Sequence, residues 1–243
     1  MEVRVLGCGD AFGSGGRFNT CFHITTPATR FLIDCGASAL IAMRRFGVEP
    51  NAIQTVFLTH LHGDHFGGLP FLILDAQLVS RRTAPLTIVG PSTLRERLAA
   101  LMEAMFPGSS TVERRFDLRL IELGPEMPTE VDGVTVTAFP VRHPSGAPSY
   151  ALRLACEGRT LCYTGDTEWV DALYPAGREV DLLIAEAYTA ERPVRYHLDW
   201  ATLRKHLPAM AAKSVLLTHM SPDMLDRIPE GCTAAEDGGV ILL

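Results

Sequence analysis

The sequence predicts an α/β fold in which two similar half-sheets pack as a sandwich with helices outside. Short β-branched and apolar runs alternate with helical patterns along the whole 243-residue chain. A strand-like segment near residue 55 is echoed near residue 214. No low-complexity, charged or Pro/Ser-rich tract marks a boundary, so we expect one domain over residues 1–243.

Strands are expected where short apolar or β-branched runs lie between turn signals, and helices where apolar residues recur with helical spacing. The expected strands are Glu2–Leu6, Cys21–Thr25, Arg30–Asp34, Thr55–Thr59, Leu86–Val89, Leu118–Glu122, Val134–Pro140, Tyr150–Leu154, Thr160–Thr164, Leu182–Glu186, Ser214–Thr218 and Gly239–Leu242. The expected helices are Ala37–Phe46, Gly67–Ser80, Ser92–Phe106, Glu168–Tyr174 and Asp199–Ala212. Thr93 with Glu96 predicts a capping box for the third helix, and Asp199 predicts an N-cap for the last.

The internal echo predicts where a site would lie. Thr55–His65 aligns with Ser214–Met224, and both segments are buried-strand patterns that end in Thr-His. Phe31–Asp34 and Leu161–Asp166 are both strands that deliver an Asp at their ends. Because strand-end loops leave an open crevice, we expect the site along the edge that the two half-sheets share.

Composition excludes several classes of protein. The chain has 22 Lys plus Arg against 28 Asp plus Glu, a net charge of -6, which argues against a broad basic surface for phosphate backbones. It shows neither a membrane span nor a signal peptide, so a cytoplasmic protein without membrane contact is expected. The 6 Cys have no C-x-x-C spacing and are expected to be buried free thiols.

The segment Thr59-His-Leu-His-Gly-Asp-His65 is the strongest chemical signal in the chain. His60 and His62 occupy alternate positions after a strand, so their side chains point the same way and can bind one metal ion. Asp64 and His65 turn away from them, towards a second position. Mixed imidazole and carboxylate donors of this kind suit two neighbouring zinc-like ions.

Three further residues stand at expected strand ends and can complete both coordination shells. They are His143, Asp166 and His219. Each alone is more often a cap or a turn residue, but together with the first cluster they give five His and two Asp. That set supplies three protein ligands per metal ion and a bridging carboxylate, with an open position for water. We expect two divalent ions, with Zn²⁺ first and Mn²⁺ or Fe as alternatives, because imidazole suits all three metals.

These motifs resemble the metallo-β-lactamase superfamily, whose pattern is His-x-His-x-Asp-His, a separate His, an Asp in a Gly-Asp-Thr context and a final His. The chain has every motif in order, and the resemblance implies a four-layer αββα sandwich. It also implies that His60, His62 and His143 bind the first metal ion and that Asp166 bridges the two. The second ion would then be bound by Asp64, His65 and His219.

Within that superfamily the chain is most similar to the tRNA 3′-processing endonucleases of the RNase Z type and their phosphodiesterase relatives. The matching pieces are Leu6–Gly13, Ala185-Glu186, His197-Leu-Asp199 and Thr218-His-Met-Ser221. The tRNA enzymes insert a long basic arm between the third and fourth ligand motifs. Residues 144–165 leave room here for one hairpin only, which argues against binding of a large RNA.

The resemblance suggests roles beside the metal ions. A bridging hydroxide would attack phosphorus, and Asp64 could accept its hydrogen bond. His197 would protonate the leaving group or bind phosphate, with Glu186 orienting its ring; the alternatives are a surface His and a strand-end charge. Asp34 is expected to hydrogen-bond a ligand His or a loop backbone, or else to form a turn.

We therefore expect a binuclear metal-dependent phosphodiesterase acting on a small nucleotide-like phosphodiester or a nucleic-acid end. Hydrolysis of a lactone, thioester or carboxylic ester is the alternative on the same fold, and iron-dependent redox chemistry is less favoured. The Gly13–Thr20 loop with Arg17 either meets the substrate or is a plain turn. The apolar stripe Leu94–Met105 is expected to be a core face, with a pocket wall or homodimer contact as alternatives.

Overall fold

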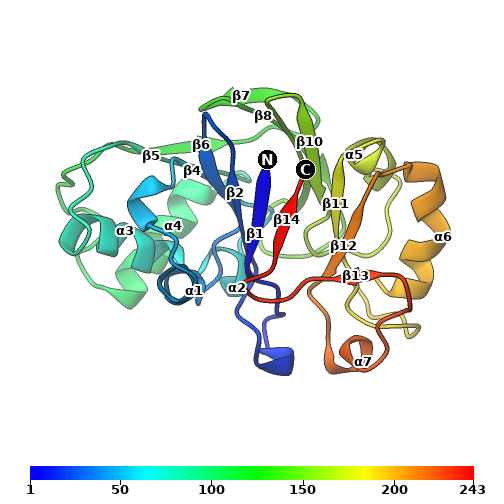
Figure 1. Ribbon diagram of the computed structural model, residues 1–243. Helices are drawn as coiled ribbons and strands as arrows, with labels where there is room; N and C mark the ends of the chain where they lie inside the picture. Colours follow the sequence, from blue (N-terminus) through cyan, green and yellow to red (C-terminus); the bar gives the residue numbers. More distant parts are fainter.

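Two seven-stranded mixed sheets lie face to face in the computed structural model, which describes residues 1–243 (Figure 1). The first sheet has the order β14 (Val240–Leu242), β1 (Glu2–Gly7), β2 (Cys21–Thr25), β3 (Arg30–Ile33), β4 (Thr55–Phe57), β5 (Leu86–Gly90) and β6 (Leu118–Glu122). The second has the order β13 (Thr233–Ala234), β12 (Val215–Thr218), β11 (Leu182–Glu186), β10 (Arg159–Tyr163), β9 (Tyr150–Cys156), β8 (Val134–Pro140) and β7 (Thr129–Val131).

Helices cover the outer face of each sheet (Figure 1). Those beside the first sheet are α1 (Ala39–Arg45), α3 (Leu69–Leu78) and α4 (Leu94–Met105), and those beside the second are α5 (Leu173–Gly177) and α6 (Trp200–Met210). The short segments α2 (Gly63–Phe66), α7 (Pro222–Leu225), η1 (Ser14–Gly16) and η2 (Pro50–Ala52) lie in the connections.

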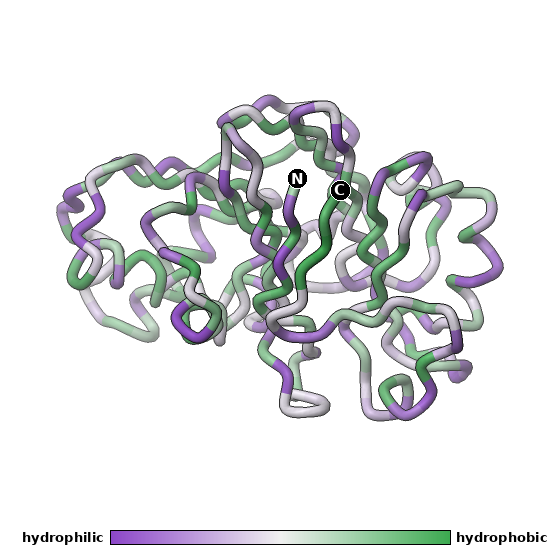
Figure 2. The backbone as a smooth tube through the Cα atoms, in the orientation of Figure 1, coloured by the Kyte–Doolittle hydropathy of each residue, from purple (hydrophilic) through white to green (hydrophobic).

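Three separate apolar cores hold the four layers together. Between the sheets, Phe22 of β2 stacks edge-on against Tyr163 of β10 with ring centroids 5.4 Å apart. The second core joins the first sheet to its helices, and the third joins the second sheet to α5 and α6. Figure 2 shows the most hydrophobic segments along the central strands. Burial on both faces explains why these strands have continuous apolar runs.

This arrangement confirms the predicted αββα sandwich, but it corrects the internal echo. Each sheet has three antiparallel strands followed by two parallel ones, β1 to β5 in the first and β8 to β12 in the second. Strands β3 and β10 are therefore equivalent, as their terminal Asp residues predict. Strand β4 is equivalent to β11 and not to β12, so pairing 55–65 with 214–224 is wrong by one strand. The two Thr-His segments are alike because both strands end at the site.

Two local predictions are wrong. Glu168 is not helical, because its carboxylate accepts hydrogen bonds from Arg142 and from the backbone N–H of Tyr196, and the helix begins only at Leu173. Thr93 does not cap α4: its φ is 72°, and Glu122 accepts a hydrogen bond from the first turn instead. Asp199 caps α6 as predicted, accepting from the Thr202 N–H at 2.8 Å.

Some elements depart from their expected bounds or were not predicted. The short strands β7 and β13 and the helix α7 are additional, and the predicted helix 67–80 is α3 preceded by the separate turn α2. All 6 Cys are free, and five of them are buried. None of the helices has the length and apolar character needed to cross a membrane.

Candidate metal centre and active site

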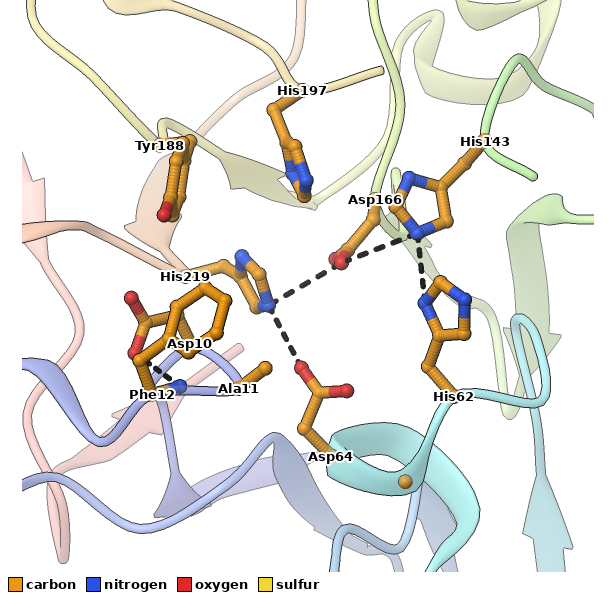
Figure 3. A pocket seen from close by; sticks show the side chains of 11 residues that line it. Asp10, Ala11, Phe12, His62, Asp64, His143, Asp166, Tyr188, His197 and His219 are labelled. Carbon is orange, nitrogen blue, oxygen red and sulfur yellow. Dashed lines mark hydrogen bonds and ion pairs between the residues drawn. The ribbon is translucent and has the colours of Figure 1, made fainter. Parts of the chain in front are cut away.

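A cavity of about 350 Å³ opens where loops from the two sheets meet, beside α2 (Figure 3). It gathers residues from distant parts of the chain at one edge of the sandwich, where the strand-end argument places them. Its lining is Asp10, Ala11, Phe12, His62, Gly63, Asp64, His143, Asp166, Tyr188, His197 and His219.

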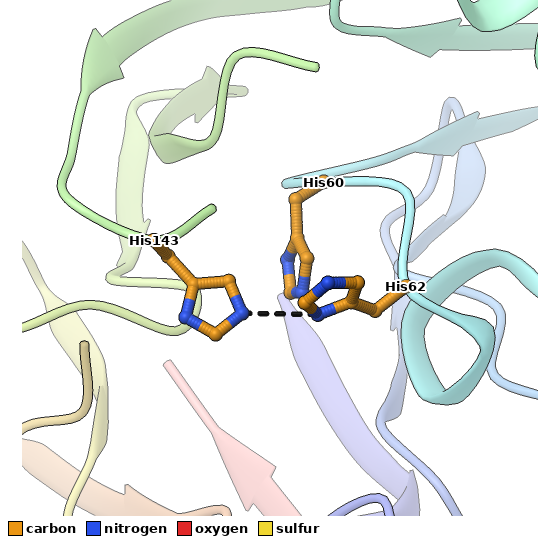
Figure 4. A group of neighbouring side chains, drawn as sticks. All are labelled: His60, His62 and His143. Carbon is orange, nitrogen blue, oxygen red and sulfur yellow. Dashed lines mark hydrogen bonds between the residues drawn. The ribbon is translucent and has the colours of Figure 1, made fainter. Parts of the chain in front are cut away.

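Three imidazoles form the first donor group at this edge (Figure 4). His60 and His62 follow β4, and His143 follows β8. His62 Nδ1 and His143 Nε2 approach to 3.0 Å, and the His143 Nδ1–H donates to the Tyr196 carbonyl at 3.0 Å. The Tyr196 contact fixes the ring so that Nε2 faces the other two imidazoles.

Two imidazoles and two carboxylates form the second donor group. They are Asp64, His65, Asp166 and His219. Asp64 and His65 lie on α2, whose turn directs them away from His62. His219 follows β12 with a left-handed φ of 56°, and its Nε2 lies 3.3 Å from a carboxylate oxygen of Asp64 and 3.3 Å from one of Asp166.

Asp166 lies between the two groups. One of its oxygens is 3.3 Å from His65 Nε2. The other is 3.9 Å from His60 Nε2 and 3.9 Å from His143 Nε2. A single carboxylate thus faces donors of both groups, which is the arrangement that a bridging ligand requires.

The carboxylates create a strongly negative potential in this buried site. Burial opposes the charged form of His219, but Asp166 and Asp64 outweigh burial and raise its pKa to about 10. Burial likewise opposes the charged form of Asp166, but the neighbouring imidazoles outweigh burial and hold the pKa of Asp166 well below its usual range. In the metal-free chain the carboxylates therefore favour positive charge at His65 and His219, whose pKa values are raised, whereas burial lowers the pKa values of His60 and His62.

Several buried donor atoms have no hydrogen-bond partner within the protein. They are His60 Nε2, His65 Nε2 and Asp166 Oδ1, all directed into the two groups. Buried polar atoms without partners cost stability. Imidazole nitrogens and carboxylate oxygens converging in this way fit divalent cations of the zinc type, each group offering at least three donors.

Asp34 positions residues of this centre through hydrogen bonds. It is fully buried at the end of β3, and its carboxylate accepts from the Thr59 N–H and hydroxyl at 2.8 Å each and from His65 Nδ1 at 2.7 Å. Burial raises the pKa of Asp34, and the His65 imidazole opposes that shift. The carboxylate thereby positions both the end of β4 and one ring of the second group.

We expect Asp34→Ala to lower the free energy of unfolding by about 3–5 kcal/mol, because it leaves buried donors without an acceptor. Asp34 also has a left-handed φ of 59°, which Asn tolerates better than Ala. Asp34→Asn should therefore lose less stability. Urea unfolding of the metal-free protein checks both values, and an Ala variant within about 1 kcal/mol of wild type would contradict this role.

Buried Glu186 and half-buried His197 form a pair beside Asp166. His197 Nδ1 donates to Glu186 at 2.5 Å, and the other Glu186 oxygen accepts from the Thr167 and Leu198 backbone N–H groups at 2.8 and 3.1 Å. Burial lowers the pKa of His197, but the Glu186 carboxylate outweighs it and raises the pKa over that of an ordinary imidazole. The ring stays partly exposed to the cavity with its Nε2 free of that bond.

The structure brings all the predicted site residues together. Six of them line the cavity, and the other four are buried beside these six, namely Asp34, His60, His65 and Glu186. Sequence reasoning gave no site role to three residues that line the cavity, which are Asp10, Phe12 and Tyr188. Asp10 and Phe12 lie in the Leu6–Gly13 piece that resembles the family, which was the available signal for them, whereas no pattern marks Tyr188. Arg17 does not line the cavity. The Leu94–Met105 stripe supplies Leu94, Leu98 and Met102 to the core, as predicted.

Comparison of the sequence with protein families gives one match over most of the chain. The family model described as "Anti-Pycsar protein Apyc1" matches residues 1–235. Ribonuclease Z of Agathobacter rectalis is 31% identical over 160 residues, 65% of this chain and 50% of that protein. Ribonuclease Z of Lachnoclostridium phytofermentans is 32% identical over 162 residues. The chain spans about half the length of these two relatives.

Solved structures give similarity over the whole chain. The short form of human tRNase Z superposes with a TM-score of 0.81 at 28% identity, covering 100% of this chain and 99% of that one. The metallo-β-lactamase fold protein YhfI from Bacillus subtilis has the same TM-score at 22% identity, covering 99% of this chain and 98% of that one, and it supports the fold alone. The predicted superfamily and its RNase Z-like branch are therefore confirmed.

Proposed function

We propose, since the chain belongs to the family described as anti-Pycsar protein Apyc1 within the RNase Z-like branch of the metallo-β-lactamase superfamily, that it is a metal-dependent phosphodiesterase. The observation that carries the proposal is the convergence of two donor groups on Asp166, next to an imidazole held by Glu186. The two donor groups alone would suit many classes of metal-dependent hydrolase. The additional imidazole, whose protonated form Glu186 favours, suits a phosphodiester, which carries a negative charge and needs a cationic partner.

In this proposal His60, His62 and His143 would hold one divalent ion, Asp64, His65 and His219 would hold the other, and Asp166 would contribute to both. Such ions, when bound, make water more acidic and polarise phosphoryl oxygens. The contacts of Asp64 with His219 and His65 are both made by one carboxylate oxygen, Oδ2. The other oxygen can therefore accept a hydrogen bond from the attacking water.

His197 supplies the proton for the leaving oxygen. Glu186 holds Nδ1, so the proton on Nε2 faces the cavity. The two backbone N–H groups that donate to Glu186 fix the carboxylate, and the carboxylate fixes the ring. The raised pKa favours the protonated imidazole, which can both attract the phosphate and act as an acid.

A small phosphodiester is the favoured substrate. The cavity of about 350 Å³ is of a size for a nucleotide. Residues 144–165 form a loop and the β9–β10 hairpin, with no long basic arm beside the cavity. Together with the net charge of -6, this favours a small nucleotide-like molecule or a chain end over a large folded RNA.

Hydrolysis by the metal-reconstituted chain tests the proposal. Bis(p-nitrophenyl) phosphate is compared with a p-nitrophenyl carboxylic ester and a lactone, each with zinc or manganese. A 3′,5′-cyclic nucleotide, a dinucleotide and a precursor tRNA then separate small substrates from large ones. We expect phosphodiester cleavage, with the small nucleotides preferred. Cleavage of only the ester or the lactone would overturn the proposal.

A further inference from the structure

Phe12 is exposed in a way that folding does not explain. It has 83% of its surface exposed, more than any other large apolar side chain, and no other aromatic side chain of the chain is exposed to a comparable degree. It also lines the cavity of the metal centre. An exposed ring forfeits the stabilisation that burial would give, so its position at the cavity needs another reason.

The loop that carries Phe12 is held rigidly. The Asp10 carboxylate, itself 1% exposed, accepts from the Phe12 N–H at 3.1 Å, the Ser14 N–H at 2.9 Å and the Ser14 hydroxyl at 2.6 Å. Gly13 and Gly15 have left-handed φ values of 69° and 67°, which reverse the chain directly after Phe12. The ring is therefore presented at the cavity rather than left on a loose loop.

Tyr188 is the second aromatic side chain of the cavity. Its ring centroid lies 4.7 Å from that of His197 and 6.1 Å from that of His219. Figure 3 shows Phe12 and Tyr188 on the same side of the metal-ligand residues, opposite His62 and His143, with the Tyr188 hydroxyl directed towards the Asp10 and Phe12 side. Burial and the Asp10 carboxylate raise the pKa of Tyr188, so the hydroxyl remains a hydrogen-bond donor at neutral pH.

We infer that Phe12 and Tyr188 form a nucleobase subsite, in which the base of a nucleoside phosphodiester stacks on Phe12 and accepts a hydrogen bond from Tyr188. The inference rests on the proposed function and adds that the base is the part of the substrate that the protein recognises. Stacking on an aromatic face tolerates all bases. The subsite therefore distinguishes nucleoside phosphodiesters from phosphodiesters that lack a base.

Two substrates with the same leaving group test the subsite. Thymidine 5′-(p-nitrophenyl phosphate) carries a base, and methyl p-nitrophenyl phosphate does not. We expect Phe12→Ala to lower the ratio of their kcat/KM values by about tenfold or more. Phe12→Trp should keep the ratio, because it preserves an aromatic face. Leu78→Ala, which truncates a 68% exposed side chain on α3 away from the cavity, is the matched control and should keep the wild-type ratio.

A binding measurement separates this inference from the proposed function. Thymidine 5′-monophosphate, titrated calorimetrically into the zinc-loaded protein, should bind Phe12→Ala about tenfold more weakly than wild type. If wild type cleaves neither substrate but this difference in Kd is seen, the phosphodiesterase proposal falls and the subsite stands. An unchanged ratio together with an unchanged Kd would overturn the subsite. So would a Phe12→Ala variant whose molecular mass in solution falls while both substrates are affected equally, because Phe12 would then contact a second copy of the chain.

Discussion

Asp166→Asn is expected to lower kcat/KM for a phosphodiester by about 10³-fold or more, because several kcal/mol of charge stabilisation depend on a complete centre. The Asp166 carboxylate faces donors of both groups, with contacts of 3.3 Å to His65 and His219. Asn keeps the size of the side chain but removes the negative charge that holds positive charge there. Metal content by mass spectrometry should fall below two ions per chain in parallel with the rate.

Asp171→Asn provides a matched control for that substitution. Asp171 is exposed and does not line the cavity, so this variant should keep the wild-type rate and metal content. If Asp166→Asn kept more than about a tenth of the wild-type kcat/KM, Asp166 would not be the shared ligand and the two-ion arrangement would be wrong.

His197→Ala is expected to lower kcat by about 10²-fold or more while leaving the metal content unchanged, because general acid catalysis contributes on that scale. The loss should be larger for a substrate that expels an alkoxide than for one that expels p-nitrophenolate, because the poorer leaving group depends more on a proton. Comparing a dinucleotide with bis(p-nitrophenyl) phosphate measures this difference.

The pH dependence of the reaction gives a second test of His197. The Glu186 carboxylate raises the pKa of His197 against the effect of burial, so the ring keeps its proton to higher pH than a free imidazole and loses it as the pH rises through that raised value. The wild-type kcat should therefore fall on the alkaline side, and this fall should be absent in His197→Ala.

His206→Ala is the matched control for His197→Ala. The His206 ring stacks on the Trp169 ring with centroids 3.7 Å apart and lies outside the cavity. Its removal should therefore leave the kinetics of both substrates unchanged. Equal losses in His197→Ala for good and poor leaving groups would rule out a role as the acid and leave only phosphate binding.

The side chains of the two donor groups could be predicted from the sequence because their positions follow from strand periodicity. His60 and His62 stand at alternate positions after a buried strand, and Asp166 and His219 stand at strand ends. These residues come together because β4 of the first sheet and β10 and β12 of the second end at the same edge of the sandwich. His143 follows β8 in the same way, and the family pattern then assigned it to the group of His60 and His62.

The rest of the site depends on tertiary contacts that no local pattern encodes. Phe12 and Tyr188 reach the cavity from separate loops. Phe12 lies in the Leu6–Gly13 piece that resembles the family, but neither residue is of a metal-ligand type, so no site role was predicted for them. The expected helix at residues 168–174 failed for a related reason. Glu168 forms hydrogen bonds with Arg142 and Tyr196, which are far from it in sequence, and these contacts override its local helical preference.

The most direct test of the central claim is a titration of the chelator-stripped chain with zinc, in which bound metal and phosphodiester hydrolysis are measured on the same samples. Two donor groups that share Asp166 predict that activity rises with metal and reaches its plateau at two ions per chain. Activity that reaches its plateau at one ion, or that survives complete removal of metal, would contradict the proposed two-metal phosphodiesterase.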